Sequence, residues 1–336
     1  METPVAAPAC IRFLLFLAAV GCGVGVEPRL PEPAASGRSP AIRAVSGPSG
    51  APVASGPSPA AFTEDVIDVA RRFVQPSNDG RLAALEDELQ RRELPYVLQT
   101  FPRTNANDDR PSGHNVVVGL GAGPPRVIVG GHFDAARLEG GDLSHGVVDN
   151  AAGVLVLLRA AETLRGAALR GTVHVVFFDM EELGLLGSRA YVQSLDPAPG
   201  AVMVNVDIVG YGDALLYGPG DLSPEHPLAG RVHRVCARHA VACVGSPRMP
   251  PSDDRSFQRA GIPAISLAVL PAAEAHRVWL FLNGELSDAL RGALAPPILS
   301  TIHTERDTLD RLDPQALTRA ARIVTDLVLD LDGAPR

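Results

Sequence analysis

Residues 172–188 carry the sequence TVHVVFFDMEELGLLGS, in which an almost continuous apolar run ends at a group of acidic side chains. Such a run of β-branched and aromatic residues is typical of a strand that is buried on both faces, as the strands of parallel sheets are. The segment from Leu185 to Leu195 then has the apolar spacing of a helix. Together they predict one strand and helix of an α/β fold, with acids at the carboxyl end of the strand.

The same alternation recurs along most of the chain. The predicted strands are residues 96–101, 115–119, 126–129, 172–178, 201–206 and 262–267. The predicted helices are residues 62–74, 80–92, 151–164, 185–195, 228–239 and 314–329. This order predicts an α/β fold, a three-layer α/β/α sandwich with a central mixed, mostly parallel sheet. Residues 270–300 fit the pattern less well and predict an inserted helix and loop.

Composition limits the class of protein. The chain has 336 residues, of which 46% are hydrophobic and 20% charged, and this is ample for one large globular domain. The formal net charge of -8, without a block rich in Lys and Arg, gives no electrostatic footprint for nucleic acid or anionic membranes. We therefore expect small partners and no nucleic acid.

The N-terminus predicts export. Arg12 precedes an apolar run, 13–20, and small residues follow it, which is typical of a signal peptide, here over residues 1–25. The run is too short to span a bilayer. Cys22 ends a stretch that resembles a bacterial lipoprotein cleavage box, so a lipid anchor on Cys22 is the alternative to a soluble secreted or periplasmic form.

The rest of the chain divides into a linker and a folded domain. Residues 26–61 are dominated by Ala, Pro, Ser and Gly and predict a disordered tether, and the catalytic domain is expected over residues 62–333. Beyond the signal segment only Cys236 and Cys243 remain. An oxidising compartment would join them in a disulfide, and two buried thiols are the alternative.

Acidic and His side chains gather where the predicted strands end. These side chains are His132 and Asp134, Asp149 ahead of a helix, Glu181 and Glu182, Asp207, and His303. Ligands of open α/β sheets bind beyond the carboxyl ends of the strands. A single acid there is more often a helix cap, but clustered carboxylates repel one another and lose solvation unless a cation neutralises them. Two imidazoles with carboxylates and no thiolate suit zinc best, with manganese or cobalt as alternatives, and Asp149 is our expected bridge between two ions.

Five segments, in this order, resemble the signature segments of the two-zinc bacterial leucyl aminopeptidases. They are His132-Phe133-Asp134, residues 148–154, residues 177–188, Asn205-Val206-Asp207 and residues 302–308. The resemblance implies a zinc-exopeptidase fold and a zinc-dependent aminopeptidase that removes N-terminal residues from peptides. It also implies two Zn²⁺ ions per chain and peptide substrates with a free N-terminus.

The resemblance implies a role for each ligand. His132 would bind one zinc and Asp149 would bridge both ions. Glu182 would complete the ligands of one metal, and Asp207 with His303 would complete those of the other.

Two further residues would act without binding metal. Asp134 would orient the ring of His132, as the outer partners of metal-bound imidazoles do. Glu181 would be the general base that takes a proton from a metal-bridging water and later gives it to the leaving amine.

Two other functions stay open at the level of sequence. The related glutaminyl cyclases use one zinc, and the double acid in residues 252–257 (SDDRSF) resembles theirs, although Ser-Asp before an aromatic residue is also common in aminopeptidases. Arg255 replaces a His that is frequent there, which leaves specificity open. A metal-free binding ectodomain is the second alternative, but such proteins usually lose ligands first, and all five are present here. The chain has no Ser or Cys nucleophile elbow, so no covalent mechanism is expected.

Overall fold

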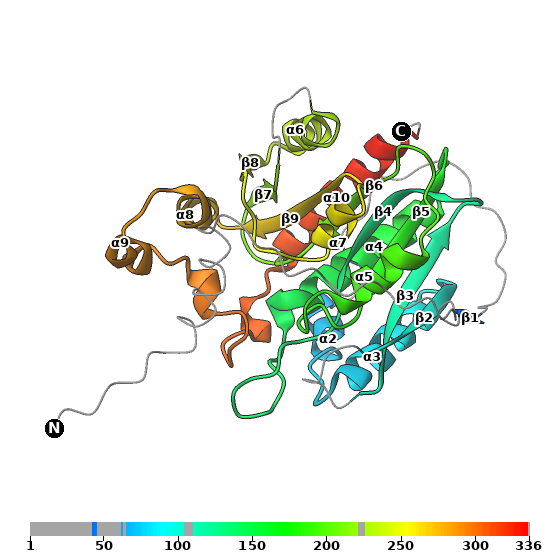
Figure 1. The fold of residues 1–336 in the computed structure, drawn as a ribbon, viewed down its shortest axis with the longest axis horizontal. Coiled ribbons are helices and arrows are strands. Elements are labelled where there is room, and N and C mark those ends of the chain that lie inside the picture. Colours follow the sequence, from blue (N-terminus) through cyan, green and yellow to red (C-terminus); the bar gives the residue numbers. More distant parts are fainter. Residues whose placement is uncertain (1–41, 46–61, 63–64, 104–109, 221–225, 335–336) are drawn as a thin grey trace, which may run out of the picture. The chain divides into compact units, whose positions relative to one another are not determined.

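One sheet forms the centre of the fold (Figure 1). The computed structural model describes residues 42–45, 62, 65–103, 110–220 and 226–334. Within them the sheet has nine strands in the order β1-β2-β3-β5-β4-β6-β9-β7-β8. The strands are β1 Ile42–Val45, β2 Tyr96–Pro102, β3 Ser112–Leu120, β4 Pro125–His132, β5 Thr172–Phe178, β6 Val202–Val206, β7 Ala214–Gly218, β8 Ala242–Gly245 and β9 Ala264–Leu270.

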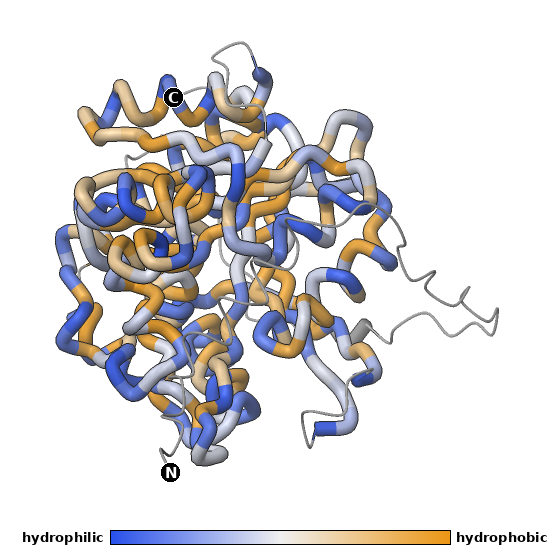
Figure 2. Tube along the Cα trace, turned by 60° about the vertical axis from the view of Figure 1, so that its left-hand side comes forward, coloured by the Kyte–Doolittle hydropathy of each residue, from blue (hydrophilic) through white to orange (hydrophobic). Residues whose placement is uncertain are grey.

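The helices cover the sheet and connect its strands. They are α2 Val66–Arg71, α3 Asn78–Arg91, α4 Ala152–Arg165, α5 Leu186–Ser194, α6 Pro227–His239, α7 Asp254–Arg259, α8 Ala272–Asn283, α9 Asp288–Ala293 and α10 Pro314–Asp332. Short turns η1 (Val147–Ala151), η2 (Pro297–Ser300) and η3 (Leu309–Arg311) precede or follow them. Helices at the surface alternate between hydrophobic and hydrophilic residues, as amphipathic helices do (Figure 2).

The sheet is mixed, with a parallel centre. Strands β5, β4, β6 and β9 run parallel to one another. On one side β3 and β2 run antiparallel to their neighbours, and on the other side β7 runs antiparallel to β9 and parallel to β8. Alternate residues of one strand enter different cores: Val127 and Val129 pack with α4 and α10, and Ile128 packs with α5 and α7. This alternation produces three layers, so the predicted α/β/α sandwich is confirmed.

The short outer elements escape sequence analysis. Strands β7 and β8 and helix α7 were not predicted, since elements of four to six residues carry too few turns or alternations to give a period. Helix α2 begins at Val66 rather than at Phe62, because Asp65 caps it by accepting a hydrogen bond from the amide of Ile67. The predicted insertion, 270–300, contains α8, α9 and η2.

The N-terminal predictions fall mostly outside the described residues. The predicted signal peptide, with Cys22, lies there entirely, and so does most of the predicted tether. Within that tether, Ile42–Val45 forms β1, which pairs antiparallel with β2, so the structure departs from a tether at these four residues. Among the helices described, none is both long and apolar enough to cross a membrane. Cys236 and Cys243 are joined in a disulfide between the end of α6 and β8.

Candidate metal centre

Parallel pairing brings the predicted site residues to one edge of the sheet. His132 is the last residue of β4 and lies opposite Phe178, the last residue of β5. Asp207 directly follows β6, and its amide donates to the carbonyl of Leu267 on β9. The acids Glu181 and Glu182 follow β5, Asp149 lies in η1 ahead of α4, and His303 follows η2. All seven predicted site residues, Asp134 included, meet at this edge.

Asp149 lies between the two imidazoles. Its Oδ1 is 3.0 Å from Nε2 of His132, and its Oδ2 is 3.0 Å from Nε2 of His303. Asp207 Oδ1 is 3.6 Å from His132 Nε2, and Glu182 Oε2 is 3.1 Å from His303 Nε2. One carboxylate therefore faces two donor groups, which is the arrangement that a bridging ligand requires.

The structure divides the five predicted ligands differently from the expected pairing. The donor atoms of His132, Asp149 and Asp207 lie within 4.8 Å of one another, and so do those of Asp149, Glu182 and His303. Asp207 thus belongs with His132, and Glu182 with His303, whereas the resemblance implies that Asp207 and His303 complete one metal and Glu182 the other. His132 and Asp207 lie together because β4 and β6 are neighbours in the sheet, so the residues at their carboxyl ends are adjacent.

Unsatisfied oxygens show that this donor set fits a divalent cation. Oε1 of Glu182 and Oδ1 of Asp207 are buried and accept no hydrogen bond within the described part of the chain. Leaving a buried polar group unpaired costs about 1–3 kcal/mol, and more for a charged group. A cation held by these oxygens and by Nε2 of each His would remove that cost.

The surrounding acids raise the pKa values of both histidines. Burial by itself lowers the pKa of His132, but the nearby carboxylates of Asp134, Asp149 and Asp207 raise it well above its ordinary value. Burial opposes the change at His303 as well, yet the charge of Glu182 and the hydrogen bonds to Asp149 and Glu182 raise its pKa to about 11. Without a metal, the centre is therefore held together by imidazolium and carboxylate pairs.

Asp134 contacts His132 mainly through its main chain. Nδ1 of His132 is 3.1 Å from the Asp134 carbonyl oxygen and 3.5 Å from Oδ1. The Asp134 carboxylate instead accepts the amides of Glu181, at 3.1 Å, and Glu182, at 3.2 Å. This residue thus fixes the turn that carries both glutamates, in addition to its contact with the imidazole.

Glu181 lies beside the two ligand groups. One of its oxygens is within 4.8 Å of donor atoms of His132 and Glu182, which makes a third group of three potential ligands. Burial raises the pKa of Glu181 well above its ordinary value, and the charges of Glu182 and Asp253 act in the same direction while that of His132 opposes them. A carboxylate with a raised pKa is suited to exchanging protons near neutral pH.

Sequence reasoning missed several residues that hold the ligands. Asp307 accepts the amides of Val148, at 2.7 Å, and Asp149, at 3.1 Å, so it fixes the main chain of the shared ligand. Ser252 donates to Oδ2 of Asp207, at 2.9 Å, which leaves Oδ1 facing His132. Both residues lie in segments that the sequence had already marked, 302–308 and 252–257, and a search there for capping side chains could have found them.

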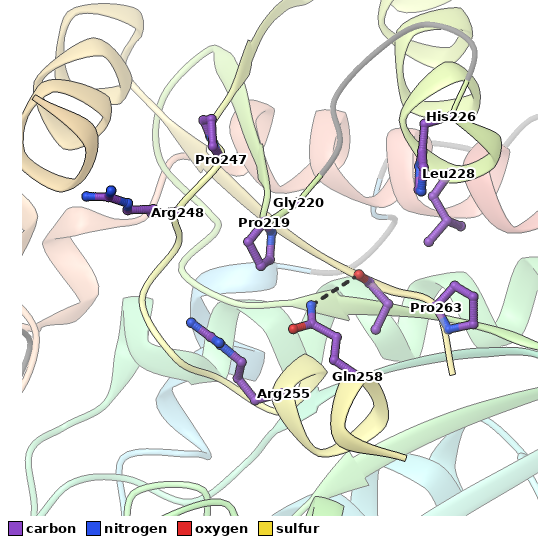
Figure 3. Close-up of a pocket in the computed structure, with 10 residues that line it drawn as sticks. Pro219, Gly220, His226, Leu228, Pro247, Arg248, Arg255, Gln258 and Pro263 are labelled. Atoms are coloured by element: carbon purple, nitrogen blue, oxygen red, sulfur yellow. Dashed lines mark hydrogen bonds between the residues drawn. The ribbon is translucent and has the colours of Figure 1, made fainter. Parts of the chain in front are cut away.

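A further cavity has a volume of about 420 Å³. Figure 3 shows Arg255 and Gln258 of α7 on one side of it and Pro219 and Gly220 on another. The remaining lining residues are His226, Leu228, Pro247, Arg248, Pro263 and Ala264. None of the seven predicted site residues lines this cavity.

Solved structures of other proteins have the same fold, and curated proteins are similar in sequence. A probable lipoprotein aminopeptidase, LpqL of Mycobacterium tuberculosis, is 30% identical over 57% of this chain and 39% of its own length. The glutaminyl cyclase of Porphyromonas gingivalis has the same fold, with a TM-score of 0.58 and 19% identity over 79% of this chain and 98% of the cyclase. The zinc aminopeptidase BSAP of Bacillus subtilis has a TM-score of 0.53 and 20% identity over 68% of this chain and 52% of BSAP.

The family itself is identified by a longer match. The chain spans about a quarter to a half of the length of the curated relatives it matches. Residues 115–328, more than half of the chain, match peptidase family M28, and this stretch contains all seven predicted site residues. The chain therefore belongs to peptidase family M28.

Proposed function

We propose that this chain is a zinc-dependent aminopeptidase that releases N-terminal residues from peptides. The observation that carries the proposal is the position of Asp149, each of whose oxygens faces a different imidazole at 3.0 Å. Membership of peptidase family M28 supports a peptidase, and the similarity to LpqL, named a probable lipoprotein aminopeptidase, supports the exopeptidase class.

The donor set supports two metal ions per chain. His132, Asp149 and Asp207 would hold one, and Asp149, Glu182 and His303 would hold the other. When bound, zinc would polarise the scissile carbonyl and lower the pKa of a water molecule towards neutrality.

Glu181 is the residue proposed to move the proton. Its carboxylate would take a proton from the attacking water and then donate it to the leaving amine. The raised pKa supports both steps, because a proton accepted near neutral pH is retained long enough to be delivered. Asp134 would keep Glu181 in place through the hydrogen bond from the Glu181 amide.

The acids at this edge also favour cleavage next to a free N-terminus. The acidic edge would attract a substrate that carries an ammonium group, whereas the middle of a peptide offers no charge to match it. We therefore propose peptides with a free amino terminus as substrates.

A glutaminyl cyclase of the same fold would need one zinc rather than two. Two complete ligand groups that share Asp149 support the aminopeptidase, while structural likeness to the P. gingivalis cyclase concerns the fold alone. Metal content and reaction type together therefore separate the two functions.

The test is a metal titration joined to a substrate panel. We expect two zinc ions per purified chain, hydrolysis of aminoacyl anilides, loss of activity with a chelator and recovery with zinc. Cyclisation of Gln-peptides with one zinc per chain would replace the proposal by the cyclase. A chain that holds no zinc and leaves both substrate classes unchanged would support the binding ectodomain.

We also propose that the protein is exported. The disulfide between Cys236 and Cys243 supports an oxidising compartment, and the N-terminal pattern supports a signal peptide. Cell fractionation of the full chain and of a Cys22→Ser variant would test the form of export. Release of the variant from the membrane fraction would indicate a lipid anchor, and an unchanged soluble protein would indicate simple secretion.

A further inference from the structure

Arg81 is a fully buried cation whose acceptors are all main-chain carbonyls. It lies on α3 and is 0% exposed. Its guanidinium donates to the carbonyls of Phe133 at 2.6 Å, Phe73 at 2.7 Å, His145 at 2.9 Å and Gly146 at 3.1 Å. Burying a cation without a carboxylate in direct contact is costly, so the position calls for an explanation beyond packing.

Three of the four acceptors belong to the segments that carry metal ligands. Phe133 follows His132 directly, and His145 and Gly146 lead into the turn that contains Asp149. The Gly146 carbonyl also accepts the amide of Ala151, so the guanidinium contacts the start of a turn that closes around Asp149. One planar group thus holds the main chain next to His132 and the main chain ahead of Asp149 at the same time.

A second side chain of α3, Asn78, also binds the segment that follows His132. Asn78, three residues before Arg81 and on the same face of α3, accepts the amide of Ala135 at 2.9 Å and donates to its carbonyl at 3.3 Å. Helix α3 therefore binds residues 133–135 through two side chains, although it lies outside the family match that begins at residue 115.

The Arg81 guanidinium and the turn that contains Asp149 lie close together at Gly146. Its φ is +57°, and an added Cβ would lie 2.9 Å from the carbonyl oxygen of Asp149 and 3.2 Å from Nη1 of Arg81. A side chain at this position would therefore crowd both the turn around Asp149 and the guanidinium.

The charge of Arg81 also suits the site. Burial lowers its pKa to about 10, which leaves it protonated at neutral pH, and the acids Asp134, Asp307 and Asp149 oppose that decrease. The cation is stabilised from a distance by the carboxylates of the proposed metal centre.

We propose that Arg81 is a positioning residue of the metal centre: it sets the spacing between His132 and Asp149, two ligands of one proposed zinc, and thereby the affinity for zinc. The inference rests on the proposed zinc site, but it makes α3, an element outside the matched family region, part of that site.

Zinc affinity, measured by competition with a chromogenic chelator, tests the inference without any substrate. Arg81→Met keeps the length of the side chain and removes its donors, and we expect zinc affinity to fall about 10- to 100-fold, the usual effect of losing an outer partner of a metal site. Arg81→Lys keeps the charge but not the planar fork, so we expect an intermediate loss. Arg91→Met is the matched control, because it removes the same charge from an exposed position on the same helix.

Two further measurements separate positioning from general destabilisation. Circular dichroism would establish that each variant is folded, and excess zinc should restore peptide hydrolysis by Arg81→Met to near the wild-type rate. If Arg81→Met does not fold, Arg81→Lys and Asn78→Ala decide, and both should bind zinc more weakly than Arg91→Met does.

Wild-type zinc affinity in folded Arg81→Met, or in both Arg81→Lys and Asn78→Ala, would overturn the inference. A wild-type chain that binds zinc yet hydrolyses no peptide would overturn the proposed function instead, and the role of Arg81 in zinc affinity would stand.

Discussion

Two regions of the molecule differ in which side chains they bury. The first is the edge formed by the carboxyl ends of β4, β5 and β6, and the second is the flank formed by α8 and α9. At the strand ends the acids are buried or half-buried, and one oxygen each of Glu182 and Asp207 accepts no hydrogen bond within the described chain. On the flank, Leu280 and Leu290 are 40% and 46% exposed, and α9 buries no residue at all. Helix α8 buries Ala275, Val278 and Phe281 against the sheet, whereas α9 adds nothing to the core. Buried polar groups without partners are thus the better guide to the chemistry of this protein.

The largest effect is expected at Glu181. Because glutamine cannot accept a proton, Glu181→Gln should lower the rate of aminoacyl-anilide hydrolysis about 100- to 10,000-fold. Zinc per chain should stay unchanged, and Glu285→Gln, an exposed acid on the flank, serves as the control. A drop in zinc content would instead make Glu181 a ligand, in the third group with His132 and Glu182.

A second pair of variants separates the shared ligand from an unshared one. Asp149→Asn should reduce binding of both zinc ions, because Asp149 belongs to both groups. Asp207→Asn should reduce binding of one only. Zinc per chain, measured after dialysis, checks this difference, and equal losses in the two variants would contradict the bridging position of Asp149.

The sequence identifies the ligand residues, but it does not show which of them lie together around one metal. All seven predicted site residues meet at one edge. They could be predicted because an acid that follows a strand is recognisable from its neighbours in the sequence. The pairing of Glu182 with His303 and of Asp207 with His132 was not predicted, since it depends on which strands are neighbours. Arg81 gave no local signal, because it is one of several charged residues in an amphipathic helix.

The metal centre should also respond to pH. The pKa of His303 is raised to about 11, so the metal-free imidazole is protonated at pH 7, and zinc must displace that proton. Zinc affinity should therefore rise with pH, by about tenfold or more per unit around neutrality. Calorimetry in buffers of different ionisation enthalpy would count the protons released. No proton release on zinc binding would show that the two histidines are neutral in the metal-free chain.

The smallest effect is expected on the flank. Leu290→Ser should change the free energy of unfolding by no more than about 0.5 kcal/mol, as surface substitutions usually do. Leu157→Ser in the buried face of α4 should cost several-fold more, and at least about 2 kcal/mol. Urea denaturation compares the two. Strong destabilisation by Leu290→Ser would mean that the flank is covered in solution.

The sequence by itself determined the alternation of buried strands and helices, and it determined which acids and imidazoles follow the strand ends. Both are local properties, because periodicity and strand boundaries depend on near neighbours along the chain. Only the tertiary structure decided how the ligands are shared. It also decided that Arg81 lies beneath them and that Asp307 holds the main chain of Asp149. Those contacts join residues that are 52 and 158 positions apart, and only the packing of the sheet with its helices sets such distances.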